Sequence, residues 1–297
     1  MTLSARQLET RRTRVGASEI AALIPPMADG TVVDHHGRGP FDIFAAKMGV
    51  KRPQSPEMRW GQIVESAILE MHCEGQGLTL LPNPGTLVHP RYPWICATPD
   101  AIARDQQGKR RLIEAKNSGR FMAHLWGAEG TGQVPIGYAA QVQVTLSTLL
   151  ELNMIDSPEA DICASIGGMP PTPFLIDFRP AVFERMAELA RVFVEQHLLT
   201  GTPPEQGWER EAAEAYLRIK YPTSREPLLE ASTEDVRLAR QISYAAARVK
   251  KWERVEAEGK NRLRARIGPH EGIAGIATNK ARADGTRVLR LAKGRAA

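Results

Sequence analysis

The sequence predicts an α/β fold, in which helices flank a mixed β-sheet. Helical patterns fill the first third of the 297 residues. Short apolar segments broken by Pro and Gly then follow between residues 79 and 116. A helical segment, two apolar strand-like segments and an amphipathic helix come next. This order, helices before a strand cluster and then α, β, β, α, indicates a mixed sheet covered by helices.

The first predicted elements are helices. The longest of them has Ser55 as N-cap and Pro56 in its first turn, which are favoured residues at these positions. Another ends at Gly49, a typical C-terminal residue. In chain order these helices cover residues 4–12, 16–24, 41–49 and 55–77.

The later elements alternate in type. Residues 79–100 are expected to form short strands, because Pro and Gly interrupt their apolar runs. A strand at 109–116 follows the turn "DQQG". The remaining elements are a helix opened by Pro135, strands at 160–168 and 172–180, and an amphipathic helix at 180–201.

Charge and composition suggest two parts, a domain at residues 1–204 and an extension at 205–297. Residues 231–297 hold 16 Lys and Arg against 7 Asp and Glu, whereas residues 1–230 hold 23 against 27. The extension is expected to be mainly helical and basic, with a terminal β-hairpin at "ADGT". Its basic face can lie along DNA phosphates, cover a subunit interface or dock a partner protein, and the sequence does not choose.

Several protein classes are excluded by composition. No apolar run is long enough for a membrane span, and the charged N-terminus lacks the apolar region of a secretory signal. Three isolated cysteines argue against a disulfide framework and indicate a reducing compartment. We therefore expect a cytoplasmic protein with no membrane partner.

Three charged residues stand out on the predicted strands. Glu114 and Lys116 are two apart on one strand and therefore share a face. Asp100 closes the preceding apolar segment, so pairing of the two segments brings it near them. Two carboxylates form a hard-oxygen site for Mg²⁺ or Mn²⁺, and an ammonium can offset charge on a phosphate. A surface ion pair at two strand ends is the alternative interpretation.

These residues resemble a known signature. "TPD…IEAK" is similar to the motif of PD-(D/E)XK nucleases, and three other segments resemble the YqaJ-like viral recombinases, which include the phage lambda exonuclease. The three segments are "RVGASEIAALI", "WGQIVESAILE" and "YAAQVQVTL", and they occur in the family order. The resemblance covers about residues 10–200 and implies a PD-(D/E)XK, restriction-endonuclease-like core.

The resemblance also implies roles for individual residues. Asp100, Glu114 and Glu65 would hold the metal, with the backbone carbonyl of Ala115 as a further ligand. Lys116 would position the attacking water.

Three more residues match positions that contact the substrate. Gln141 would hold the water or a substrate phosphate. Arg14 and Ser18 would bind a terminal 5′-phosphate.

The function implied by the resemblance is a metal-dependent exonuclease. It would act 5′→3′ on linear double-stranded DNA and leave 3′ overhangs for phage-type recombination or repair. The implied partners are DNA ends and a single-strand annealing protein, and the implied assembly is a homo-oligomer such as a trimer. Two alternatives stay open, an endonuclease of the same superfamily and a DNA-binding or assembly protein with a degenerate nuclease fold.

Overall fold

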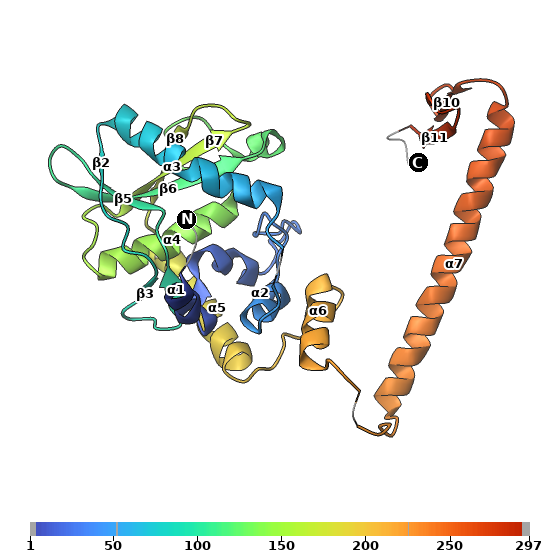
Figure 1. The fold of residues 1–297 in the computed structure, drawn as a ribbon, viewed down its shortest axis with the longest axis horizontal. Helices are drawn as coiled ribbons and strands as arrows, with labels where there is room; N and C mark the ends of the chain where they lie inside the picture. The colour runs from blue at the N-terminus through green and yellow to red at the C-terminus, as the bar shows by residue number, and fades with distance from the viewer. Residues whose placement is uncertain (1–3, 52, 225, 293–297) are drawn as a thin grey trace. The chain divides into compact units, whose positions relative to one another are not determined.

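The computed structural model describes residues 4–51, 53–224 and 226–292. Its contacts divide the chain into two units, Met1–Ser224 and Arg225–Ala297 (Figure 1). The sequence placed the boundary earlier, after residue 204. Each unit is described below by itself.

The first unit contains helices and two sheets (Figure 1). Its α-helices are α1 (Ala5–Arg12), α2 (Pro40–Lys47), α3 (Pro56–Gln76), α4 (Ile136–Glu151), α5 (Pro180–Phe193) and α6 (Glu211–Lys220). Three further segments are short helices of other types. η1 (Ala17–Leu23) and η2 (Arg120–Leu125) are 3₁₀ helices, and η3 (Val194–Leu198) is a π-helix. As expected, Ser55 caps α3 by accepting a hydrogen bond from the backbone N–H of Met58. The predicted helix at 16–24 is instead the 3₁₀ helix η1.

The central sheet has the order β2-β5-β6-β7-β8. Its strands are β2 (Thr79–Leu80), β5 (Ala101–Arg104), β6 (Arg110–Ser118), β7 (Glu159–Ile166) and β8 (Thr172–Asp177). β6 runs parallel to β7, and the other neighbours are antiparallel, so the sheet is mixed as the sequence predicts. β6 is the central strand.

The two faces of β6 pack against different helices. Ile113 and Ala115 lie in an apolar cluster with Ile68 and Leu69 of α3. Leu112 lies in a second cluster, with buried side chains of α4. Because successive strand residues alternate between faces, Glu114 and Lys116 project to the side of Leu112. Both charged residues therefore face α4.

A smaller sheet lies beside the N-terminal segment, with the order β1-β4-β3. Its strands are β1 (Val15–Gly16), β3 (Leu87–Val88) and β4 (Ile95–Ala97). β1 pairs in parallel with β4, which places Gly16 beside Cys96. The N-terminal segment is thereby held next to the chain that leads into Asp100.

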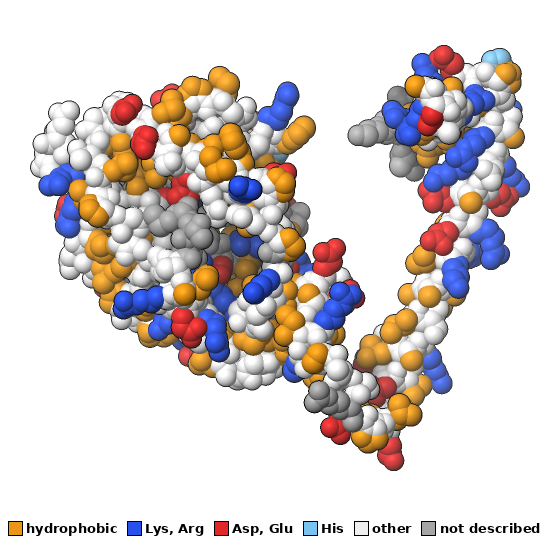
Figure 2. All heavy atoms as spheres, in the orientation of Figure 1, with side chains coloured by type: hydrophobic (Ala, Val, Ile, Leu, Met, Phe, Trp, Pro, Cys, Tyr) orange, Lys and Arg blue, Asp and Glu red, His pale blue; other side chains and the backbone are white. Residues whose placement is uncertain are grey.

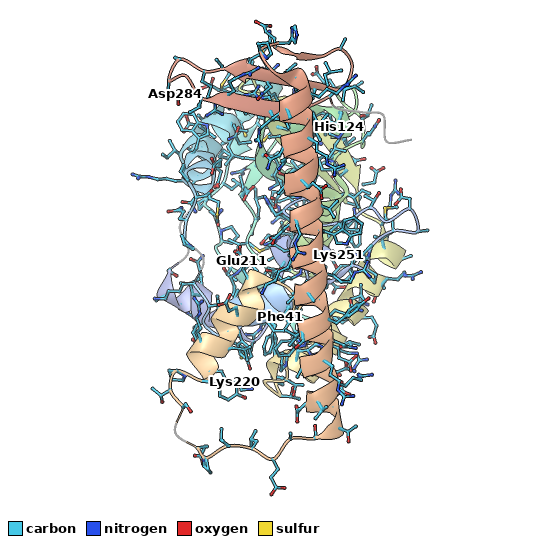
Figure 3. All side chains as sticks on the ribbon, turned by 90° about the vertical axis from the view of Figure 1, so that its right-hand side faces the viewer. Phe41, His124, Glu211, Lys220, Lys251 and Asp284 are labelled. Carbon is cyan, nitrogen blue, oxygen red and sulfur yellow. The ribbon has the colours of Figure 1, made fainter. Side chains whose placement is uncertain are left out.

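Helix α6 explains why the first unit extends past residue 204. Tyr216 is buried, and its ring centroid lies 5.1 Å from that of Phe44 and 6.2 Å from that of Phe41 in α2. Figure 3 shows Phe41 next to α6. Full burial of one aromatic side chain of this size stabilises a fold by about 2 kcal/mol. Residues 211–220 therefore belong to the core of the first unit.

The second unit consists of a long helix and a small sheet. Helix α7 (Thr233–Ile267) begins with a capping box at Ser232, and the sheet has the order β11-β10-β9. The strands are β9 (Gly272–Ile273), β10 (Ala277–Ala281) and β11 (Arg287–Leu291). β10 and β11 form the expected hairpin, whose turn holds Asp284 and Gly285.

Two further observations concern the whole chain. In the part that the structure describes, no helix is both long and apolar enough to cross a membrane. Cys73, Cys96 and Cys163 are buried and unpaired, and burial raises the pKa of each thiol. Each of these thiols is therefore shielded and poorly ionised.

Candidate active site

Asp100 lies where the chain passes from β4 to β5. β5 pairs with β6 in a register that places Ala101 opposite Ile113, so Asp100 comes next to Glu114. The Asp100 carboxylate accepts a hydrogen bond of 3.0 Å from the backbone N–H of Ala115. The sheet itself therefore holds this carboxylate against the central strand.

Lys116 joins the two carboxylates. Its ammonium is 3.0 Å from Oε2 of Glu114 and 3.3 Å from Oδ2 of Asp100. The Glu114 side chain is fully buried, and those of Lys116 and Asp100 are 12% and 21% exposed. The three residues predicted from the strand pattern thus meet in one partly enclosed cluster.

Helix α4 completes one wall of the cluster. Gln141 donates a hydrogen bond of 2.9 Å to Oε2 of Glu114. Tyr138 lies one turn earlier, and the Lys116 ammonium stands 5.5 Å from its ring centroid, within the range of a cation–π contact. The sequence analysis found Gln141 but missed Tyr138. Their i, i+3 spacing on one helix face was the available signal.

The ionisation of the cluster follows from its burial. Burial and the neighbouring Asp100 charge raise the pKa of Glu114 to about 8, although Lys116 opposes this. Burial alone would lower the pKa of Lys116, but Asp100 and Glu114 outweigh it and raise that pKa. Lys116 is therefore a permanent cation, and a further positive charge is needed to keep both carboxylates ionised.

A divalent cation fits the oxygen atoms at this place. Oε1 of Glu114 is buried and has no hydrogen-bond partner among the described residues. A buried carboxylate oxygen without a partner is costly, and an ion would satisfy it. Asp100 and Glu114 together supply the hard oxygen ligands that Mg²⁺ and Mn²⁺ prefer.

Glu65 belongs to α3, which packs on the face of β6 that carries Ile113 and Ala115. It is half-buried on α3, whose neighbouring Val64 packs on the Ala115 face of β6, whereas Glu114 faces α4. Across residues 4–51, 53–224 and 226–292, no three His, Cys, Asp or Glu side chains form a metal-binding group. Asp100 and Glu114 therefore stand as a pair, and the metal role of Glu65 stays a prediction.

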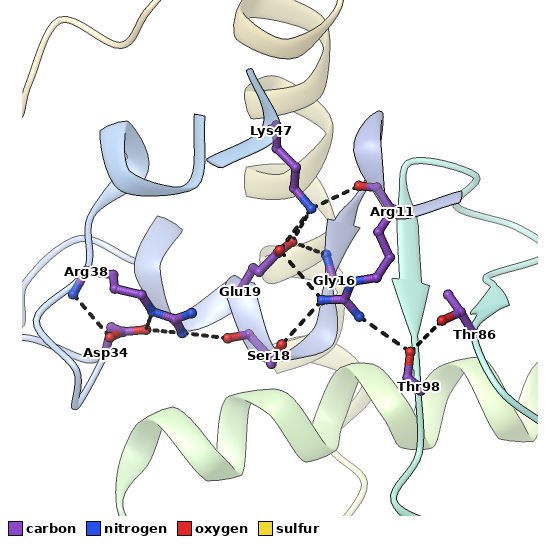
Figure 4. Close-up of polar contacts among 9 residues, drawn as sticks. All are labelled: Arg11, Gly16, Ser18, Glu19, Asp34, Arg38, Lys47, Thr86 and Thr98. Carbon is purple, nitrogen blue, oxygen red and sulfur yellow. Dashed lines mark hydrogen bonds and ion pairs between the residues drawn. The ribbon is translucent and has the colours of Figure 1, made fainter. Parts of the chain in front are cut away.

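The N-terminal segment forms a second polar cluster (Figure 4). Arg11 lies 3.4 Å from the hydroxyl of Ser18 and 3.4 Å from that of Thr98, two residues before Asp100. Arg14 points elsewhere and donates to the backbone carbonyls of Thr10 and Pro93, each at 2.9 Å. The arginine beside Ser18 is therefore Arg11, although the family resemblance implied Arg14.

Glu19 holds this cluster together. Its carboxylate is 2.7 Å from the Lys47 ammonium and 3.6 Å from the Arg11 guanidinium, and it accepts a hydrogen bond from Gly16 N–H (Figure 4). Burial would raise the pKa of Glu19, but Lys47 and Arg11 overcome this and lower it. Glu19 is thus ionised and fixes the position of Arg11 next to Ser18.

Comparison with known proteins covers this part of the chain. Residues 7–148 match the model of the YqaJ-like viral recombinase domain. This segment, just under half of the chain, is similar to the YqaJ-like viral recombinase domain. No curated protein sequence matches the chain. The clusters around Lys116 and Glu19 both lie in this segment.

Solved structures agree with this similarity. An alkaline exonuclease from Laribacter hongkongensis, LHK-Exo, is 15% identical, with a TM-score of 0.50, and the match covers 71% of this chain and 99% of that protein. Its complex with dAMP gives 16% identity, a TM-score of 0.51 and the same coverage. At this identity the likeness shows the fold, and it confirms the predicted α/β fold class.

A large cavity lies away from the two clusters. It measures about 1040 Å³ and lies between α4, β8 and α5. None of the residues that the sequence predicts for the site lines it. This cavity is therefore separate from the Lys116 cluster in its lining residues.

Proposed function

We propose that this protein is a metal-dependent DNA exonuclease that hydrolyses phosphodiester bonds at the Asp100–Glu114–Lys116 cluster. The observation that carries the proposal is the Lys116 ammonium within 3.3 Å of both carboxylates. Similarity to the YqaJ-like viral recombinase domain and the fold shared with an alkaline exonuclease support it.

The residues divide the work in a definite way. Asp100 and Glu114 would hold Mg²⁺ or Mn²⁺, with Glu65 and the carbonyl of Ala115 as proposed additional ligands. When bound, the metal supplies Lewis-acid activation of water and of the scissile phosphate. Lys116 orients the water and offsets negative charge on the phosphate. Gln141 fixes Glu114 through its hydrogen bond and, by the family likeness, would also hold the water or a substrate phosphate.

The substrate and setting follow from the family likeness. We propose 5′→3′ degradation of linear double-stranded DNA that leaves 3′ overhangs for a single-strand annealing protein. A homo-oligomer, such as a trimer, in the cytoplasm of a bacterium or phage-infected cell belongs to the same proposal.

A direct assay tests the activity. Linear duplex DNA should be degraded with Mg²⁺ or Mn²⁺, and a chelator should stop the reaction, whereas closed circles stay intact. Cutting of closed circles would support the endonuclease alternative. Retarded migration of DNA without cleavage would support the binding-protein alternative.

A first prediction concerns Arg11. Arg11→Ala should slow degradation of 5′-phosphorylated ends about ten-fold or more and leave 5′-hydroxyl ends nearly unchanged, because one charge-assisted hydrogen bond to phosphate contributes about 1.5–3 kcal/mol. Arg11→Lys keeps the charge beside Glu19 and separates loss of the phosphate contact from loss of folding.

The matched variant is Arg14→Ala. Its guanidinium is engaged by backbone carbonyls, so we expect equal effects on the two kinds of end. If Arg14→Ala and not Arg11→Ala lowers the preference for phosphorylated ends, Arg14 and not Arg11 binds the terminal 5′-phosphate.

A second prediction concerns Tyr138. Tyr138→Leu should lower kcat about ten-fold with little change in KM, because a desolvated cation–π contact contributes about 1–2 kcal/mol to the position of Lys116. Tyr138→Phe retains the ring and should retain most activity. Equal losses in the two variants would assign the effect to the hydroxyl instead.

A further inference from the structure

Helix α7 carries an apolar stripe in its N-terminal half. Leu238, Ile242, Ala245, Val249 and Trp252 are separated by alternating steps of four and three residues, so they lie along one side of the helix. The side chains of Ile242, Val249 and Trp252 are 69%, 56% and 58% exposed. In Figure 2 hydrophobic side chains gather along this half of α7.

The second unit does not cover this stripe itself. Its small sheet packs near the C-terminal end of α7, where Ile267 is buried. Every side chain from residue 233 to residue 259 is exposed. Several neighbouring apolar side chains exposed in one stripe are typical of a binding surface.

The remaining sides of this half are polar or basic. By the heptad spacing, Lys250, Lys251 and Arg254 lie on the side away from the stripe. This division gives the helix one face suited to another helix and another face that stays in water.

We propose that this stripe forms a parallel two-stranded coiled coil with a second copy of the chain. Ile242 and Val249 occupy the a positions of the heptads, and Leu238, Ala245 and Trp252 occupy the d positions. β-branched residues at a, with γ-branched residues such as Leu at d, favour two parallel strands.

Charge complementarity selects the parallel arrangement. Arg248 is at position g and Glu253 is at position e of the next heptad, so in a parallel pair Arg248 faces Glu253 of the second copy. In an antiparallel pair g positions face g positions, so Arg248 would face Gln241 or Arg248 of the second copy and not Glu253. Within its own helix Arg248 donates a hydrogen bond of 3.0 Å to the exposed hydroxyl of Tyr244 and lies 5.7 Å from the centroid of its ring.

The length of the coiled coil is limited by the sequence that follows. Glu256 continues the stripe but pairs with Lys260 at 2.6 Å, and Gly259 takes the next apolar position. The apolar seam thus spans two heptads, which is short for a coiled coil. We therefore expect a dimer contact that is reversible and depends on protein concentration.

Charge exchange tests the partner and its orientation. In light scattering over a concentration series on the full chain, Arg248→Glu should shift the association to at least about ten-fold higher concentration, as for loss of about 1.4 kcal/mol. Glu253→Arg should do the same, and the double variant Arg248→Glu/Glu253→Arg should recover the wild-type curve. Arg254→Glu makes the same charge change on the outer side and should leave the curve unchanged.

Cysteine crosslinking tests the register. Val249→Cys should form a covalent dimer under mild oxidation, because equal a positions face each other only in a parallel pair, and the native cysteines are buried. Lys251→Cys on the outer side is the control. Equal crosslinking of the two variants, or a wild-type curve for Arg248→Glu, would overturn the proposal.

The proposal is independent of the nuclease assignment. Any association through another part of the chain would be the same in all of these α7 variants, so it would not change the differences between them. Cleavage of DNA by the Arg248→Glu variant shows whether the nuclease site is intact, whatever the outcome for α7.

Discussion

Lys116→Ala is expected to lower the rate of DNA cleavage by about 10³-fold, because removal of one preorganised charge or donor at a reacting centre costs 10²–10³-fold or more. Lys116 contacts both carboxylates, and among the described residues no other Lys or Arg forms an ion pair with either of them. DNA binding should largely survive, since many phosphate contacts contribute to it. Single-turnover cleavage and a gel-shift assay, both on the same linear duplex, measure the two effects.

The matched control is Lys109→Ala. Lys109 is exposed in the turn that connects β5 and β6, so its loss changes the net charge equally without touching the cluster. It should keep near-wild-type cleavage. Turnover by Lys116→Ala at the rate of this control would refute the site assignment. Glu114→Gln provides a second variant with the same expected loss and nearly the same shape.

Glu19→Gln is expected to lower the free energy of unfolding by about 2–3 kcal/mol. Breaking a buried ion pair usually costs 3–5 kcal/mol, and the 16% exposure of Glu19 reduces that figure. The loss leaves the Lys47 and Arg11 charges without their shared carboxylate. Urea unfolding followed by circular dichroism measures the change, and Glu9→Gln in the exposed pair with Arg12 should have almost no effect.

The pH dependence of this effect has a definite sign. The folded pKa of Glu19 is lowered below its ordinary value of 4.5, so its ion pairs contribute fully above pH 4.5. The contribution is lost as pH falls toward the folded pKa. The stability difference between wild type and Glu19→Gln should therefore shrink in acid, and a difference that grows in acid would contradict the role given to Glu19.

The strand-borne part of the site could be predicted from sequence because the rules are local. Two-residue alternation places Glu114 and Lys116 on one face, and a short hairpin turn brings Asp100 to them. The Gln141 contact joins residues 27 apart in sequence and was reached only through resemblance to a family. Tyr138 was missed because an aromatic residue on a helix ordinarily signals a core.

Other features depend on geometry that spacing does not encode. Whether Arg11 or Arg14 reaches Ser18 is decided by the end of α1 and the 3₁₀ turn of η1, where one residue changes the direction of a side chain. The boundary after residue 204 rested on composition, whereas Tyr216 packs on Phe44 and extends the first unit. Glu65 lies on α3, and its role at the metal stays a prediction.

The Lys116 ammonium between the two carboxylates also affects the stability of the protein without bound metal. Lys116 offsets part of the repulsion between Asp100 and Glu114, and the raised pKa of Glu114 lets that carboxyl hold a proton, so we expect the chain to fold without metal. A chelator should therefore abolish DNA cleavage without unfolding the protein, whereas it unfolds a zinc finger. Metal supply can then act as a reversible control on turnover while the pool of folded protein stays constant.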